Sequence, residues 1–147
     1  MSTTRRPVFD HAVHAANAWL RDVAEEFDTD DRHFAYRVLR AWLHLLRDRL
    51  TVEASAHFTA QLPELLRGIY YDGWDPSAVP QRYDVDVYES RFARDANISL
   101  HDVSRAAPAV TAVAQRHLSP GQVDKVFGQL PEDMRALLRP RVRQTPR

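Results

Sequence analysis

The stretch QLPELLRG at residues 61–68 returns in altered form as QLPEDMRA at residues 129–136. A proline at the start of a helix gives up an N–H that would have no partner there, and the glutamate after it suits the positive end of the helix dipole. Each copy therefore predicts a corner between two short helices, with the leucine buried and the proline opening the helix that follows. These structural corner residues are Leu62, Pro63, Leu130 and Pro131.

The similarity between the two stretches extends outward at a spacing of 68 residues. Leu50 corresponds to Leu118, and Thr51, which we expect to cap a helix, corresponds to Ser119. One gap further upstream changes the spacing to 69, and the matched residues there are Trp19 with Tyr88, Val23 with Phe92, and Ala24 with Ala93. Each half therefore predicts two long helices, a short helix, a corner and a second short helix.

The repeat predicts an all-α fold, a compact bundle of about eight helices built from two pseudo-repeated halves. The halves are expected to pack on one core, because each exposes apolar side chains on more than one face and is too short to bury them alone. The predicted division is a flexible N-terminus at 1–7, a single helical domain at 8–138 and a basic flexible tail at 139–147. Within the domain, the first half covers about 8–72, the linker about 72–84 and the second half about 85–138.

Apolar spacing predicts the long helices. Between residues 8 and 27, apolar side chains recur every three and four positions from Phe9 to Phe27, which predicts one apolar stripe on a helix of about five turns. The acidic segment DTDD at 28–31 is expected to cap a second helix that runs to about Leu50. Apolar residues cover more than half of its circumference, so this helix is expected to be central. In the second half, Pro108 predicts a kink.

Composition sets limits on the function. The chain has 147 residues, 44% of them hydrophobic, and a formal net charge of zero, which is typical of one globular domain and not of a nucleic-acid binder. Residues 139–147 carry four arginines and no acid, which leaves 16 basic and 20 acidic side chains in residues 1–138. We therefore expect at most weak nucleic-acid contact, through this arginine tail. No apolar run resembles a signal peptide or a membrane span, so no membrane association and a cytoplasmic location are expected.

Several of these segments, taken in order, resemble a known family. They are RDVA before DTDD, RVLRAWLHLLRDRLTVEA at 37–54, AQLPELLRG, GW at 73–74, and GQLPEDMRALL ending at 138. The chain resembles the domain of unknown function 2267 family over about residues 15–138, and the paired LP corners are the most specific part of the resemblance. The resemblance implies a helical bacterial or archaeal protein made of two related halves. It implies no established activity and no catalytic residues.

A polar strip on the central helix is the first candidate binding site. It consists of Arg37, Arg40, His44 and Arg47, which recur at three and four residues on the side that apolar groups leave free. Arginines at this spacing can bind a phosphate or an acidic partner through paired hydrogen bonds. The alternative is a solvated stripe paired to nearby acids such as Asp48.

Metal and catalytic motifs are weak in this sequence. His11 and His14 lie three residues apart on a helix, but no third ligand follows at a motif spacing. The acids Asp28, Asp30 and Asp31 lack the glycine and the glutamate of a calcium loop and suit helix capping better. Without cysteines, thiol chemistry is excluded. We therefore predict no metal, no cofactor and no catalytic residues, and an enzyme is not favoured.

An aromatic group around the linker is the remaining candidate. Its members are Tyr70, Tyr71, Trp74, Tyr83 and Tyr88. They are expected either to line a crevice between the halves or to hold the linker against the domain. The leading functional hypothesis is a non-enzymatic helical interaction module whose partner is another protein or a second copy. The alternative is a binder of a small anionic or amphipathic ligand, in the crevice between the halves or on the Arg37–Arg47 strip.

Overall fold

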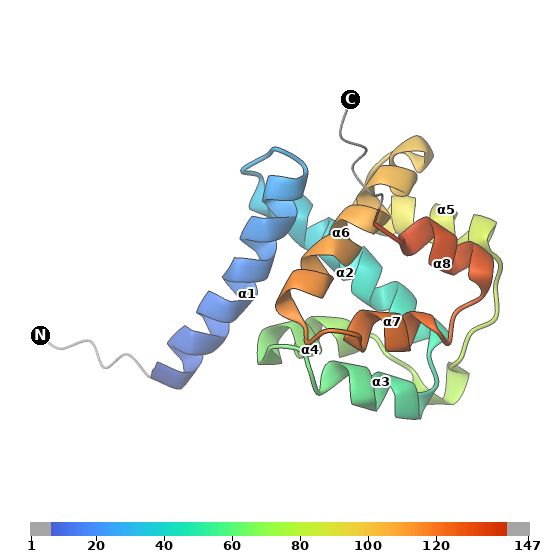
Figure 1. Ribbon diagram of the computed structural model, residues 1–147, viewed down its shortest axis with the longest axis horizontal. Helices are drawn as coiled ribbons and strands as arrows, with labels where there is room; N and C mark the ends of the chain where they lie inside the picture. The colour runs from blue at the N-terminus through green and yellow to red at the C-terminus, as the bar shows by residue number, and fades with distance from the viewer. Residues whose placement is uncertain (1–6, 141–147) are drawn as a thin grey trace, which may run out of the picture.

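A computed structural model describes residues 7–140, and all regular structure in this range is helical (Figure 1). The first half contains α1 (Pro7–Glu26), α2 (Arg32–Arg49), α3 (Val52–Thr59), α4 (Glu64–Tyr71) and the 3-10 turn η1 (Pro76–Ala78). The second half contains α5 (Val85–Ala96), the 3-10 turn η2 (Leu100–Asp102), α6 (Val103–His117), α7 (Gln122–Phe127) and α8 (Glu132–Leu138). The predicted all-α fold of about eight helices is confirmed. None of the helices in the described range combines the length and apolar content needed to cross a membrane.

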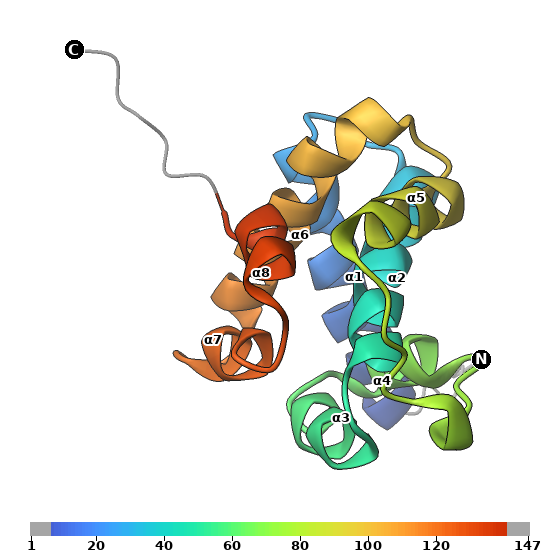
Figure 2. The same ribbon diagram turned by 90° about the vertical axis from the view of Figure 1, so that its right-hand side faces the viewer.

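Helix α2 lies at the centre of the molecule, in contact with α1, α4, α5 and α6 (Figure 2). It begins where expected, because the Asp31 carboxylate accepts hydrogen bonds from the backbone N–H groups of His33 and Phe34 at 3.0 and 3.1 Å. Residues Val38 to Leu46, Arg40 excepted, are buried. One turn therefore presents buried side chains in every direction, which is why four helices surround it.

The apolar stripe predicted for α1 is buried only along part of the helix. Ala16, Trp19 and Val23 are buried, but Val8, Phe9 and Val13 are 61%, 62% and 50% exposed. In Figure 1 the first turns of α1 project beyond the rest of the molecule. The periodicity predicted the correct face of the helix, but no other element within residues 7–140 extends far enough to cover its beginning.

The two corners are built by the same backbone hydrogen bonds. Leu62 N–H donates to Thr59 at 3.0 Å, and Leu130 N–H donates to Phe127 at the same distance. Pro63 and Pro131 each occupy the N-cap position of the next helix, where their carbonyls accept from the arginine four residues later. The side chains of Leu62 and Leu130 are 3% and 4% exposed.

The two halves differ in local detail. Thr51 caps α3 through its hydroxyl, as expected, but the corresponding Ser119 caps no helix, because α7 begins after Gly121. Gly121 has a φ of +85°, which favours glycine. Helix α6 begins at Val103 and continues through Pro108 to His117. The predicted kink at this proline stays a prediction, and so does the duplication itself.

One hydrophobic core contains residues of both halves. The buried Trp42 in α2 illustrates this, because its indole N–H donates to the Thr111 hydroxyl in α6 at 3.0 Å. Its ring lies 6.3 Å from that of Phe58 and 6.2 Å from that of Phe127.

Helix α4 ends at Tyr71 and α5 begins at Val85, on either side of the expected linker. Pro7, expected to be flexible, is helical, while residues 1–6 and 141–147 of the predicted flexible termini lie outside the described range.

Candidate functional site: the arginine pocket

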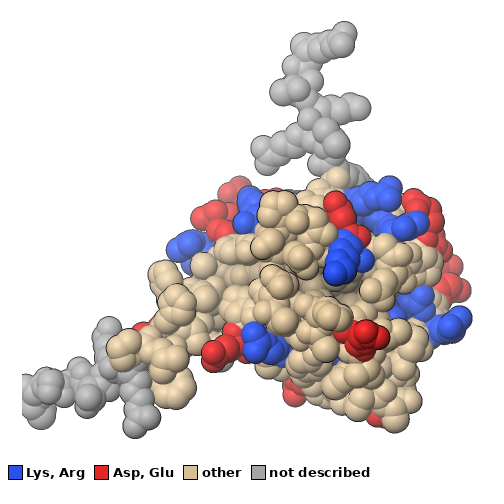
Figure 3. Space-filling model, turned by 60° about the horizontal axis from the view of Figure 1, so that its bottom comes forward, with Lys and Arg blue, Asp and Glu red and all other residues tan. Residues whose placement is uncertain are grey.

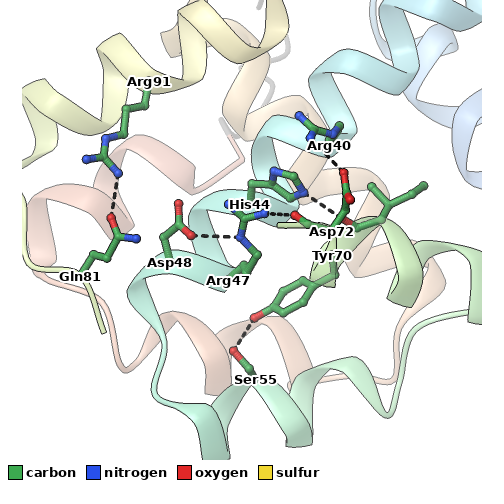
Figure 4. Close-up of polar contacts among 10 residues, drawn as sticks. Arg40, His44, Arg47, Asp48, Ser55, Tyr70, Asp72, Gln81 and Arg91 are labelled. Atoms are coloured by element: carbon green, nitrogen blue, oxygen red, sulfur yellow. Dashed lines mark hydrogen bonds and ion pairs between the residues drawn. The ribbon is translucent and has the colours of Figure 1, made fainter. Parts of the chain in front are cut away.

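The polar strip of α2 contacts other parts of the protein, with Arg37 and Arg40 half-buried. Arg37 Nε donates to the carbonyl of Ala96, the last residue of α5, at 3.1 Å. The guanidinium of Arg40 lies 3.3 Å from the carboxylate of Asp72, the first residue after α4 (Figure 4). These two arginines therefore hold α5 and the start of the linker against α2.

The other two members of the strip lie deeper. His44 is buried, and its Nε2–H donates to the carbonyl of Ile69 at 2.8 Å. Arg47 pairs with the Asp48 carboxylate at 3.0 Å and also donates to the carbonyl of Asp72 (Figure 4). The structure thus brings Arg40, His44 and Arg47 together with the linker, so the two ligand sites considered separately from the sequence overlap there. Arg37 lies apart, at the end of α5, and does not line the shared pocket.

A pocket of about 400 Å³ lies at this location, between α2, the linker and α5. We call it the arginine pocket, and the side chains that matter for its chemistry are Arg40, His44 and Arg47 from α2, Tyr83 from the linker, and Tyr88 and Arg91 from α5. Its volume lies within the range of small-molecule sites in proteins.

The charges that line the arginine pocket pair almost completely. Four arginines and three aspartates line it. Three ion pairs, Arg40 with Asp72, Arg47 with Asp48, and Arg94 with Asp95, have nitrogen to oxygen distances of 3.0 to 3.3 Å. Arg91 remains. It makes no ion pair within residues 7–140, but donates to the side-chain oxygen of Gln81 at 2.9 Å, with its guanidinium 4.4 Å from the ring centre of Tyr83.

Tyr88 lies one turn before Arg91 on α5 and is 1% exposed. Its hydroxyl finds no hydrogen-bond partner among the described residues. Burial raises the pKa of Tyr88 well above its ordinary value, so the hydroxyl keeps its proton. Burial likewise raises the pKa of Tyr83 to about 12. Tyr88 is therefore a residue of the pocket lining whose buried hydroxyl, a proton donor, has no acceptor among the described residues.

The aromatic group around the linker divides into two sets. Tyr70 and Tyr71 pack edge to face at 5.0 Å, and Trp74 packs on Tyr71 at 4.9 Å. The Tyr70 hydroxyl also bonds Ser55 at 2.7 Å (Figure 4). These three hold the end of α4, whereas Tyr83 and Tyr88 line the pocket. Two members of the aromatic group therefore line a crevice and three pack at the start of the linker, which are the two arrangements considered from the sequence.

Burial lowers the pKa of His44 below its ordinary value of 6.5. The folded protein therefore prefers the neutral ring, whose N–H binds Ile69. The stability that the neutral His44 ring contributes is present in full above pH 6.5. It is lost as the pH falls from 6.5 through the lower pKa of His44 in the folded state. We expect the free energy of unfolding to drop over this window in urea titrations. His44→Gln should remove that part of the drop, and an unchanged pH profile in this variant would contradict the assignment.

The other candidates from the sequence do not come together in a binding site within residues 7–140. His11 and His14 are exposed on α1, and residues 7–140 contain no group of three or more histidine, aspartate or glutamate side chains placed to hold a metal ion. Asp31 caps α2, and Asp28 lies in the preceding turn with a φ of +53°. Of the arginine tail, Arg139 pairs with Glu132 at 3.6 Å, and residues 141–147 are outside the described range.

Sequence reasoning missed Arg91. Tyr88 and Arg91 are three residues apart on a predicted helix, a spacing that places two side chains on one face. That signal was present in YESR at 88–91. What the sequence did not supply was the opposing helix, because α5 contacts α2 only after the linker has turned the chain.

Eight helices around one core, with a polar pocket beside the central helix, define a small all-α domain within the described residues. The chain belongs to the DUF2267 family, described as an uncharacterized conserved protein, whose family model matches residues 16–137. The comparison with curated proteins gives no match.

Proposed function

We propose that this protein binds a small anionic ligand, with carboxylate or phosphate oxygens, in the arginine pocket. The observation that carries the proposal is the combination of Tyr88 and Arg91 on one face of α5. Among the described residues, the buried hydroxyl of Tyr88 has no acceptor, and Arg91 is the arginine of the pocket lining that pairs with no carboxylate. An unsatisfied buried polar group costs about 1 to 3 kcal/mol. An oxyanion supplies an acceptor for that hydroxyl and a negative charge for that guanidinium.

The electrostatics of the pocket support an anion over a cation. The three aspartates already pair with arginines, so binding a cation would require breaking an existing ion pair. His44 is held neutral and donates its Nε2–H to Ile69, so it adds no charge. The pocket lining therefore carries a single excess positive charge, from Arg91.

Tyr88→Phe is expected to have opposite effects on stability and on binding. Removing the orphan hydroxyl should raise the free energy of unfolding of the unliganded protein by about 1 kcal/mol, because a buried donor without a partner is eliminated. The same change should weaken binding of inorganic phosphate or succinate about tenfold, because one hydrogen bond to the anion is lost. Urea denaturation and titration calorimetry measure the two effects. Tyr36→Phe, at a tyrosine that is 39% exposed on α2, is the matched control.

The arginines provide the second arm of the same calorimetric test. Arg91→Ala should abolish phosphate binding, and Arg40→Ala should weaken it, because the Asp72 carboxylate is then left without its ion pair. Arg21→Ala removes an exposed arginine from the outer face of α1 and should change neither binding nor stability. Equal binding by the Arg91→Ala and Arg21→Ala variants would refute the proposal.

A second candidate function, the non-enzymatic interaction module, is favoured by a different observation. The beginning of α1 exposes Val8, Phe9 and Val13 on the same stripe that forms the core further along the helix. Exposed apolar side chains that are contiguous mark protein interaction sites. Loss of partner binding or of self-association on Phe9→Asp tests this candidate.

A further inference from the structure

A second pocket, of about 790 Å³, lies where the two halves meet at the second corner. Its lining comes from the junction of α2 and α3, from the linker at 80–84, and from the corner and first turn of α8 at 129–134. We call it the corner pocket. It is about twice as large as the arginine pocket, and its volume lies within the range of small-molecule sites.

Part of the lining of the corner pocket is apolar. Leu130 and Met134, which are 4% and 0% exposed, belong to the hydrophobic core and are held in place by it. Pro80 and Pro131 are exposed. A proline ring has no N–H and a fixed shape, so it offers apolar surface without a polar group that must keep its water. The pocket therefore contains apolar surface that is accessible to a ligand and is already in place.

Arg49 is the half-buried basic residue of the corner pocket. Its Nη1 donates to the carbonyl of Gln81 at 2.7 Å, and its guanidinium lies 5.5 Å from the ring centre of Tyr83. Its Nε is buried without an acceptor among residues 7–140, and Arg49 makes no ion pair in this range. Because a guanidinium has five N–H donors, most of the donor capacity of Arg49 is not used by the described protein.

The remaining charges of the lining also leave a basic group unpaired. Arg82 is exposed and makes no ion pair with a described carboxylate. The two acids are engaged where helices begin, because Asp84 accepts from the N–H of Val87 at 3.0 Å and Asp133 from that of Met134 at 2.8 Å. On the face seen in Figure 3, acidic and basic side chains lie in small separate groups and form no broad field of one sign. Attraction of an anion is therefore local, at the two unpaired arginines.

We infer that the corner pocket binds a small amphipathic organic anion. Arg49 and Arg82 hold its carboxylate, since arginine binds this group through paired N–H donors. Its hydrocarbon body packs on Pro80 and Pro131, and the burial of this body adds affinity in proportion to its area. An inorganic anion would leave the apolar surface uncovered, and a neutral hydrocarbon would leave both arginines unpaired. The lining thus matches a molecule that has both parts.

The corner pocket and the arginine pocket share the linker but have different arginines. Tyr83 lines both, with the guanidinium of Arg91 4.4 Å and that of Arg49 5.5 Å from its ring centre. Gln81 also binds both, since its side-chain oxygen accepts from Arg91 and its backbone carbonyl from Arg49. Because each pocket has its own unpaired arginine, the inference does not depend on anion binding in the arginine pocket.

Hexanoate, acetate and 1-hexanol test the two parts of the ligand separately. Hexanoate has a carboxylate and a hydrocarbon body, acetate has little more than the first, and hexanol has only the second. The full chain with methionine methyl groups labelled with carbon-13 reports binding by NMR, because Met134 lines the pocket and the only other methionine is Met1. Hexanoate should shift the Met134 signal and bind about tenfold or more tightly than acetate or hexanol. Equal affinities, or an unmoved Met134 signal, would overturn the inference.

The arginines are tested in the same titration. Arg82→Ala should weaken hexanoate binding about tenfold and leave urea denaturation unchanged, because this side chain is exposed. Arg49→Lys keeps the charge but loses the planar set of donors, and should also weaken binding about tenfold. Arg21→Ala removes an exposed arginine of α1 and is the matched control. Equal hexanoate binding by the Arg82→Ala and Arg21→Ala variants would overturn the inference.

Arg91→Ala distinguishes the two pockets. It should abolish phosphate binding in the arginine pocket and keep the shift of Met134 on addition of hexanoate. Loss of that shift would place hexanoate in the arginine pocket and overturn the corner pocket as its site. Phosphatidylglycerol vesicles test a lipid as another source of the same chemistry, and the full chain should not sediment with them. Sedimentation with vesicles that is lost on Arg82→Ala would overturn a free anion as the ligand.

Discussion

Leu62→Ala and Leu130→Ala are each expected to lower the free energy of unfolding by about 2 to 5 kcal/mol, the range found for buried leucines replaced by alanine. Both side chains are nearly inaccessible to solvent. Each also follows a short helix whose end is fixed by a backbone hydrogen bond from the leucine itself. Truncation therefore leaves a cavity at a corner whose backbone is not free to collapse into it. Urea or guanidinium denaturation of the two variants measures the change.

Leu65→Ala is the control for this pair. Leu65 lies in the first turn of α4, three residues after Leu62, and is 44% exposed. Its replacement should cost no more than about 0.5 kcal/mol, as is usual for surface positions. A loss below that value at both Leu62 and Leu130 would contradict the structural role of the two corners.

The corners and caps were predictable because they depend on interactions within a few residues. Asp31 and Thr51 cap helices that start within one turn of them. Pro63 and Pro131 open helices for a local reason, the absence of an N–H. Ser119 shows the limit of that reasoning. It occupies the position that corresponds to Thr51, yet Gly121 lets the chain turn and α7 begins two residues later than a serine cap would start it.

The burial of α1 could not be predicted in the same way. Apolar periodicity identifies which face of a helix turns inward, but the length of that face that is covered depends on the neighbours. The contacts of α1 are with α2, α4 and α6. The positions of these helices follow from the whole chain, so no pattern within residues 8–27 indicates that Val8, Phe9 and Val13 stay exposed.

Of the candidate site, the residues that α2 contributes were predictable from the sequence, and those from other elements were not. Spacing alone placed Arg40, His44 and Arg47 on one side of α2, which lines the pocket. Arg47 pairs with its neighbour Asp48, an acid that the sequence already offered as a partner. The other partners are Asp72 and the carbonyl of Ile69, which lie 25 or more residues further along the chain. Arg91 comes from α5, in the second half of the chain. Sequence spacing identifies side chains that share a helix face, whereas a pocket between helices requires their packing.

A fragment of residues 1–78, which ends after η1, is expected to lose cooperative folding altogether. In the full chain α2 is covered by α5 and α6 on the sides that the first half leaves open. Without them, Trp42 loses its hydrogen bond to Thr111 and its contact with Phe127. Burying an apolar side chain of this kind contributes about 1.5 to 3 kcal/mol, and several are exposed at once in the fragment.

That loss is comparable to the whole stability of a small domain, about 5 to 15 kcal/mol. The fragment should therefore show helical far-ultraviolet circular dichroism without near-ultraviolet signals, bind anilinonaphthalene sulfonate and melt without a sharp transition, as compact states without fixed packing do. A chain ending at Pro140 keeps every described helix and should melt cooperatively like the full protein. A sharp, cooperative transition of the 1–78 fragment would mean that α1 to α4 fold independently. The contacts of α2 with α5 and α6 would then join two domains and would not form the core of one.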